Sequence, residues 1–151
     1  MASNRIERKI NMNWDHKDIW RKREDKFLIE ISRHEVDYKE KDKGSSRWCI
    51  YIYIYPGYFL FEKILKEGRH SDIINDMPLH GGESYFQKHI NEKGEITSIQ
   101  IGADYDHLHD DRYSFYNTKE NASSVFADAD NLFNWAKINN KEKESIVFYD
   151  I

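Results

Sequence analysis

The sequence predicts a single α+β domain, in which a mostly antiparallel sheet carries a carboxy-terminal helix packed on one face. Three observations lead to this fold class. Apolar residues alternate in several short runs, two of these runs are joined by a hairpin-length loop, and a later segment has apolar residues at helical spacing. The 151 residues are the usual size of one domain. Aromatic residues make up 15% of the chain, enough for a buried core despite 33% charged residues.

The amino-terminal region, residues 1–26, is predicted to form a helical or irregular extension ahead of the α+β domain of residues 27–151. Ile10 and Trp14 are four residues apart, as on one face of a helix, and Trp20 is a further anchor. Basic and acidic side chains interleave toward the end of this extension. Such a mixture is typical of a solvated helix face rather than of a nucleic-acid site.

The middle of the chain predicts two strands and a short connection. Residues 27–36 alternate apolar and polar side chains, and residues 47–55 place Ile on one face and Tyr on the other. The polar, turn-forming residues 39–46 connect these strands. Residues 59–65 fit either a short helix or a capping loop, and the polar stretch 66–76 follows.

Residues 84–90 and 96–103 predict a β-hairpin, because both alternate like strands and the five residues between them contain a glycine. Antiparallel pairing brings the segment before the first strand to the segment after the second. His80 is then expected near Asp106 and His107 at the open end of the hairpin.

The carboxy-terminal part predicts an amphipathic helix that Ser123 or Ser124 caps. Its apolar residues recur at a spacing near 3.6 residues and form one stripe, which is expected to pack across the sheet. The members of this stripe are Val125, Phe126, Ala129, Leu132, Phe133 and Ala136. Residues 146–149 are expected to add an edge strand.

Charge and cysteine content narrow the possible partners and location. A net charge of −4 and a pI near 6.0 provide no global positive field, so we expect no generic nucleic-acid binding and no membrane binding. The single Cys49 cannot form an internal disulfide, and no apolar run approaches the length of a membrane span. The first residues are too polar for a signal peptide, which predicts a cytoplasmic protein.

Two short segments, residues 80–85 and 101–110, contain most of the chemically versatile side chains and the only Gly-Gly pair. Glycines allow a ligand or a neighbouring strand to approach the backbone closely, and imidazoles and carboxylates hold polar groups. We therefore expect one site between the two segments. The residues predicted to bind its ligand, a small polar molecule or a host protein, are His80, Gly81, Gly82, Ser84, Tyr85, Asp104 and His107.

The same segments could hold a divalent metal ion. Oxygen and nitrogen ligands recur within seven positions at Asp104, Asp106, His107, His109 and Asp110. The predicted metal ligands are His80, Asp104, His107 and His109. Without a metal, an imidazole beside carboxylates serves as a general acid or base, or forms a salt-linked turn.

Aromatic residues form a second pattern along residues 47–55. Trp48, the alternating Tyr51, Tyr53 and Tyr55, and the distant Tyr85 fit either a wall that stacks on a planar ligand or an aromatic face of the core. Because such residues dominate the cores of small domains, the core alternative is favoured.

At these motifs the chain resembles a largely uncharacterised family of small proteins from bacteriophages and bacteria. The family pattern is a Trp-Cys-Gly-Tyr-Val-like strand, then His-Gly-Gly-x-Thr-Tyr, then Ile-Gly-Phe-Asp-Cys-x-His before a carboxy-terminal helix. The matching segments here are residues 48–52, 80–85 and 101–107, within a resemblance that covers about residues 27–138. The departures from the pattern are Ile50, Ser84, Ala103 and Tyr105.

This resemblance implies a phage origin and a common site that includes His80, Gly81, Gly82, Asp104 and His107. Because Tyr105 replaces the second cysteine of the family pattern, any role of that thiol is absent from this chain.

Two functions remain open from the sequence. The first is a phage-type accessory binding protein that holds a small polar or phosphorylated ligand, or blocks a host defence protein. In this function His80 and the backbone amides of the Gly-Gly pair hold an anion. The second is a metal-assisted hydrolase of a nucleotide or phosphoester, in which Asp106 or His109 handles protons.

Overall fold

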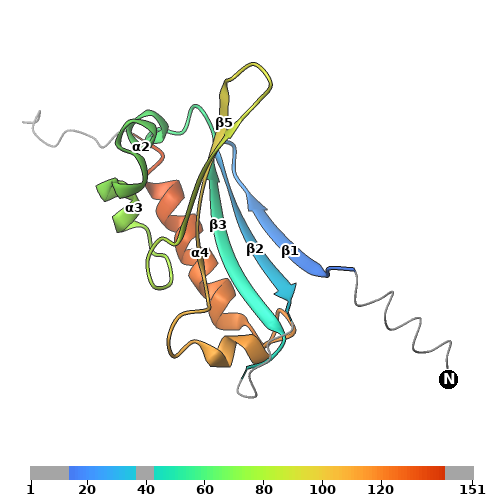
Figure 1. Ribbon diagram of the computed structural model, residues 1–151. Helices are drawn as coiled ribbons and strands as arrows, with labels where there is room; N and C mark the ends of the chain where they lie inside the picture. Colours follow the sequence, from blue (N-terminus) through green and yellow to red (C-terminus); the bar gives the residue numbers. More distant parts are fainter. Residues whose placement is uncertain (1–13, 37–42, 142–151) are drawn as a thin grey trace, which may run out of the picture.

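The computed structural model describes residues 14–36 and 43–141, and these residues form one antiparallel sheet with helices on one side (Figure 1). The sheet has five strands in the order β1-β2-β3-β5-β4, which confirms the predicted α+β class. The strands are β1 (Lys17–Arg23), β2 (Phe27–Glu35), β3 (Ser46–Ile54), β4 (Tyr85–Ile90) and β5 (Ile96–Asp104).

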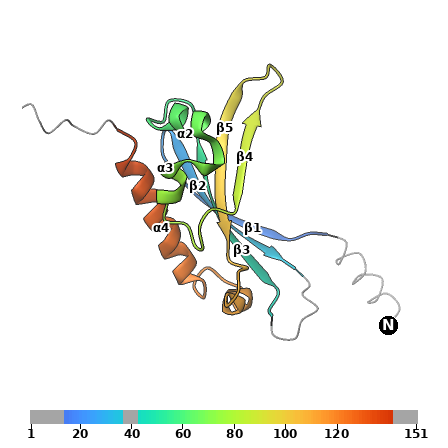
Figure 2. The same ribbon diagram turned by 60° about the vertical axis from the view of Figure 1, so that its left-hand side comes forward.

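The helices α2, α3 and α4 all lie on the same side of the sheet, and the other face carries no described helix (Figure 2). No helix among the described residues has both the length and the hydropathy needed to cross a bilayer. The helical elements are α2 (Phe61–Glu67), η1 (Gly68–His70), α3 (Asp72–Asp76), η2 (Asp111–Phe115) and α4 (Ser123–Ile138).

The core lies between the sheet and α4, and the alternation of the strands determines which side chains enter it. In β3, Trp48 and Ile52 are fully buried on the helix side, whereas Tyr51 and Tyr53 point to the other face and are half-buried. Leu132 from the predicted stripe of α4 is also fully buried. The sequence prediction of an Ile face and a Tyr face is therefore confirmed, and Trp48 belongs to the core.

The amino-terminal region differs from the helix predicted for it, because residues 17–23 form strand β1 and belong to the same sheet. The ring of Trp20 stacks on Trp48 with centroids 5.6 Å apart, and it meets Phe126 of α4 edge-on at 5.3 Å. These partners are distant in sequence, and they stabilise an extended segment whose local pattern resembles a polar helix face. The part of the predicted extension before residue 14 lies outside the described residues.

The start of α4 also differs from the prediction, because neither Ser123 nor Ser124 caps it. The residue before the helix is Ala122, whose carbonyl accepts hydrogen bonds from the N–H groups of Val125 and Phe126. Ala122 is fully buried, so the chain enters the helix through a tight turn that requires a small side chain rather than a capping hydroxyl. The edge strand predicted for residues 146–149 lies outside the described residues.

The first prediction concerns the docking of β1. We expect Trp20→Ala to lower the free energy of unfolding by about 2 to 3 kcal/mol, because it removes a stacked, partly buried aromatic side chain. Urea unfolding followed by circular dichroism measures the change. Trp14→Ala is the matched control, because Trp14 is 75% exposed and its loss should change stability by no more than about 0.5 kcal/mol. Equal effects of the two substitutions would contradict the packing of β1 against α4.

Candidate functional site

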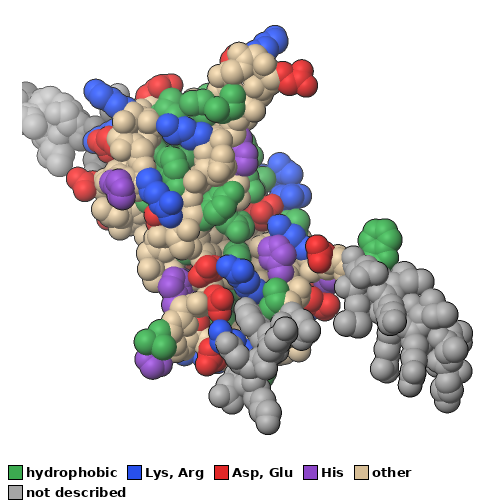
Figure 3. Space-filling model, viewed as in Figure 1, with side chains coloured by type: hydrophobic (Ala, Val, Ile, Leu, Met, Phe, Trp, Pro, Cys, Tyr) green, Lys and Arg blue, Asp and Glu red, His purple; other side chains and the backbone are tan. Residues whose placement is uncertain are grey.

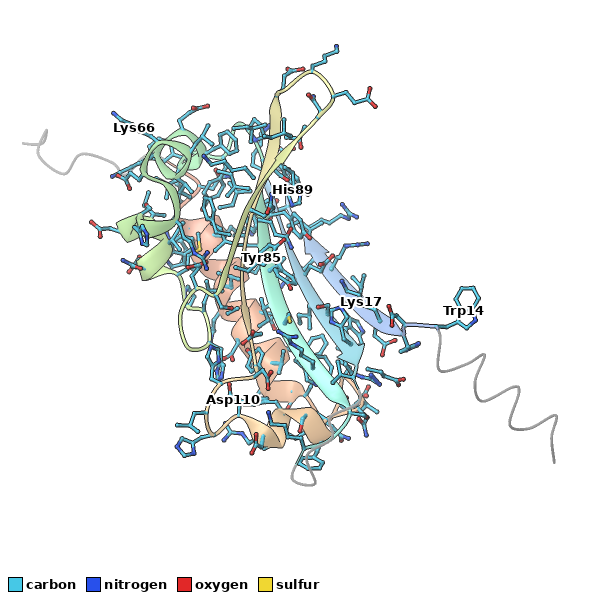
Figure 4. All side chains as sticks on the ribbon, in the orientation of Figure 1. Trp14, Lys17, Lys66, Tyr85, His89 and Asp110 are labelled. Atoms are coloured by element: carbon cyan, nitrogen blue, oxygen red, sulfur yellow. The ribbon has the colours of Figure 1, made fainter. Side chains whose placement is uncertain are left out.

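The pairing of β4 with β5 brings the two predicted site segments together. Tyr85 pairs with Gly102, within one residue of the register predicted from the sequence. The N–H of Ser84 donates to the carbonyl of Gly102 at 2.9 Å, and the N–H of Asp104 donates to Ser84 Oγ at 3.3 Å. The chain before β4 and the chain after β5 therefore leave the sheet side by side, and Asp110 lies below this end of the hairpin (Figure 4).

The carboxylate of Asp110 lies at the centre of the cluster that results. His80 Nε2 is 2.9 Å from both carboxylate oxygens of Asp110. Asp110 Oδ2 also accepts a hydrogen bond from the backbone N–H of His107 at 3.0 Å and lies 3.1 Å from His107 Nδ1. Asp110 is 8% exposed, so these contacts replace most of its water. We call His80, His107 and Asp110 the imidazole–carboxylate cluster.

Hydrogen bonding controls the ionisation of Asp110. Burial alone disfavours the charged carboxylate, yet the hydrogen bonds from His80 and His107 outweigh this effect and lower the pKa of Asp110 below its ordinary value. The carboxylate is therefore ionised throughout the neutral range, as a metal ligand or a strong hydrogen-bond acceptor must be.

Two tyrosine rings fix the orientation of His80. Its ring stacks on Tyr105 with centroids 4.3 Å apart and an interplanar angle of 19°, and it meets Tyr113 at 5.4 Å. The hydroxyl of Tyr105 donates to Asp128 on α4 at 2.6 Å, and burial, followed by this hydrogen bond, raises the pKa of Tyr105. The cluster is thus held to α4 through Tyr105, a residue for which the sequence predicts no role in the site.

The two predicted glycines have different roles. Gly81 has φ +69°, and a Cβ at this position would lie 2.9 Å from His107 Cε1, so only glycine allows the imidazole to approach this closely. Gly82 has φ +86° and open space around it. Its N–H donates to the carbonyl of Leu79 at 3.0 Å, so it stabilises the turn and is not free to hold an anion as predicted.

Asp104 lies at the margin of the cluster. One of its oxygens is 3.7 Å from His107 Nδ1, and the other is 3.4 Å from Arg47 Nη2. Its side chain is 25% exposed. Asp104 therefore lies next to the three residues whose ligand atoms lie closest together, but it is not one of them.

Two of the predicted site residues, His109 and Tyr85, lie away from the cluster. His109 has φ +73° and is exposed, because residues 107–110 form a turn in which the Asp110 N–H donates to the His107 carbonyl. His107 and His109 would share a face only in an extended chain, and the described cluster of possible ligands does not include His109. Tyr85 points to the helix-free face, where its ring meets Tyr51 at 5.5 Å.

The geometry of the cluster suits a metal ion. One ligand atom from each of His80, His107 and Asp110 lies within 4.8 Å of the others. Ligands bonded to zinc at about 2.0–2.1 Å are themselves about 3.0–3.4 Å apart, so side-chain shifts below about 1 Å would complete the coordination. Two imidazoles and one carboxylate are also a ligand set that divalent transition metals prefer.

Two hollows of the described surface lie away from the cluster. One, of about 960 Å³, is lined by residues including Phe59, Ile73 and Trp135. Another, of about 580 Å³, lies between β1 and α4 beside Trp20 and Phe126. The cluster therefore lies near the surface rather than inside either hollow, and any ligand would be held by polar contacts more than by burial.

No family model matches the chain, and comparison with curated proteins and with solved structures likewise yields no match.

The second prediction concerns Asp110. A depressed folded-state pKa means that the ionised carboxylate stabilises the fold above its unfolded pKa of about 3.9, and that this stabilisation is lost as the pH falls through the folded value. We expect Asp110→Asn to lower the free energy of unfolding by about 1 to 3 kcal/mol at neutral pH, because it weakens charge-assisted hydrogen bonds.

Urea unfolding between about pH 7 and about pH 3 measures this difference, which should shrink toward the acid end. Asp111→Asn is the matched control, since Asp111 is the exposed neighbour of Asp110. A difference that is the same at every pH would contradict the role of the ionised carboxylate.

Proposed function

We propose that the protein binds a divalent metal ion through His80, His107 and Asp110 and uses the ion to hold a small polar or phosphorylated ligand. The observation that supports this proposal is the convergence of three ligand atoms within 4.8 Å on two segments joined only through a hairpin. Zinc is the first candidate, because imidazole and carboxylate ligands are typical of open zinc sites.

The surroundings of the cluster support a bound ion. His80 is oriented before any ion arrives by the Tyr105 and Tyr113 rings, and the absence of a side chain at Gly81 leaves room for His107 beside it. Oriented ligands raise metal affinity, because less side-chain entropy is lost on binding.

The charge and coordination of the cluster explain why an anion would be the ligand. One carboxylate and one divalent cation leave a net positive charge of about one unit at the site. Three protein ligands leave coordination positions that a phosphate oxygen or a carboxylate can fill. The partly exposed side chains of His80 and His107 make these positions accessible from solvent.

A second candidate function is the metal-assisted hydrolysis of a phosphoester, and the position of Asp104 favours it. Its carboxylate lies 3.7 Å from His107 Nδ1 and has no place among the three closest ligands. A carboxylate beside the metal ligands can accept a proton from a metal-activated water. Asp104 replaces Asp106 and His109 as the candidate base, because its carboxylate lies 3.7 Å from His107 Nδ1 and His109 is outside the cluster.

The third prediction tests the metal site directly. We expect the untagged protein to bind one zinc ion, and His80→Ala to weaken binding at least about a hundredfold, because it removes a direct ligand. Isothermal titration calorimetry measures the affinity, and atomic emission measures the stoichiometry. His109→Ala is the matched control and should bind zinc like the unaltered protein. Equal losses in both variants, or no binding at all, would overturn the proposed site.

The fourth prediction separates the two functions. If the protein hydrolyses its ligand, phosphate release from a panel of nucleotides should require metal, stop with chelator, and fall at least about a hundredfold in Asp104→Asn while zinc affinity changes little. If it is a binding protein, a nucleotide or phosphorylated metabolite should be recovered unaltered after metal-dependent binding. Turnover that persists in chelator would contradict both functions.

A further inference from the structure

The face of the sheet opposite α4 carries no described helix (Figure 2). Directly paired residues share a face, so the strand register defines the side chains that lie across it. One row across the sheet consists of Arg21, Glu30, Tyr51, Gly102 and Tyr85. The neighbouring row runs from Arg23 on β1 to Gln87 on β4. We call this surface the open face.

Aromatic rings occupy the β3–β4 side of the open face. Tyr85 is 39% exposed and meets Tyr51 edge-on at 5.5 Å. Tyr53 lies nearly parallel to His89, with centroids 6.0 Å apart. Figure 4 labels Tyr85 and His89 along the sheet, to the right of α4. The prediction that the tyrosine row forms part of the core is therefore wrong for these rings, which stay accessible on the sheet surface.

The backbone and an ion pair with a buried carboxylate hold this surface in place. A Cβ at Gly102 would collide with the Tyr51 ring and the Ile50 carbonyl, so glycine here lets the ring lie flat across β5. Glu30 is 5% exposed and accepts a hydrogen bond from Arg21 Nε at 3.0 Å, which keeps the guanidinium on the open face. The aromatic and basic groups are thus ordered without a ligand.

Basic side chains border the aromatic rings along β1 and at the start of β3. They are Lys17, Arg21, Arg23 and Arg47. Glu30 pairs with Arg21 and Asp104 pairs with Arg47, while the charges of Asp106 and Asp15 act on Arg47 and on His34 beside Lys17. Within the described residues, Lys17 and Arg23 have no ion-pair partner. Figure 3 shows basic side chains on the β1 side of this view. The β1 side of the open face therefore has a local excess of basic side chains on a chain whose net charge is −4.

We propose that the open face binds single-stranded nucleic acid, with bases stacked on Tyr85 and on the Tyr53–His89 pair and phosphates held by the basic side chains of β1. Sheet surfaces that combine exposed aromatic rings with arginines and lysines fit this ligand, because every base has a face that stacks and every nucleotide has a charge. Arg23 and Tyr53 are two strands apart, about 10 Å, a span that one nucleotide and an arginine side chain bridge together.

The charge of the whole chain sets the expected strength of this binding. A net charge of −4 gives no long-range attraction, so affinity must come from stacking and from the few basic groups on this face. We therefore expect binding at low salt that weakens as salt rises, with a shallow dependence that reflects two to four phosphate contacts.

The experiment measures fluorescence anisotropy of labelled oligo-dT and oligo-rU of about twelve nucleotides with the full-length protein, at about 50 and about 200 mM salt. Tyr85→Ala and Arg23→Glu are each expected to weaken binding at least about fivefold. Lys137→Glu is the matched control for charge, because Lys137 is exposed on α4. Thermal unfolding of each variant confirms that the fold is retained, and a Tyr85→Phe variant should bind like the unaltered protein.

Three outcomes would overturn the proposal: no oligonucleotide binding at low salt, a loss in Lys137→Glu equal to that in Arg23→Glu, or tighter binding of a duplex of the same length. The proposal would also be overturned if oligonucleotides failed to bind and the protein instead bound a protein partner in a way that Tyr85→Ala abolishes. His80→Ala separates this surface from the metal site, because the open face should bind oligonucleotides in that variant and in the presence of chelator.

Discussion

The antiparallel pairing of β5 with both β3 and β4 is the constraint on which the rest of the structure depends. Its register aligns Tyr51 with Gly102 and Gly102 with Tyr85, which arranges the open face. The same register places the start of β4 beside the end of β5, so the chain segments around His80 and Asp110 meet there. A slip by one residue would invert every side chain of β4 and disrupt the open face and the cluster.

Asp110 shows how one buried carboxylate links stability with chemistry. A buried charge must be paired, and the donors available to this one are two imidazoles and a backbone N–H. The same lone pairs and imidazole nitrogens that hydrogen-bond one another can instead coordinate a cation. The stacking of His80 on Tyr105, which is bonded to α4, keeps the arrangement rigid in either state. The cluster therefore needs little rearrangement to accept an ion.

Local patterns predicted the elements whose stabilising contacts are close in sequence or periodic, and missed those stabilised by distant partners. The hairpin and the stripe of α4 could be predicted because loop length and apolar spacing are sequence properties. Strand β1 could not, since its Trp20 finds Trp48 only in the folded sheet. The hairpin register predicted His80 near His107, and their ring centroids lie 5.7 Å apart. The contact of His80 with Asp110 and the exposed position of His109 follow from a turn at residues 107–110 that the pattern did not predict.

Asp104 connects the imidazole–carboxylate cluster with the open face, because its two oxygens face different partners. One is 3.7 Å from His107 Nδ1, and the other is 3.4 Å from Arg47 on the open face. A cation held by His107 would attract this carboxylate and weaken its pair with Arg47, which leaves the guanidinium available to a phosphate. Any such effect is reciprocal, so a cation that changes the affinity for the oligonucleotide by some factor has its own affinity changed by the same factor, although neither ligand requires the other.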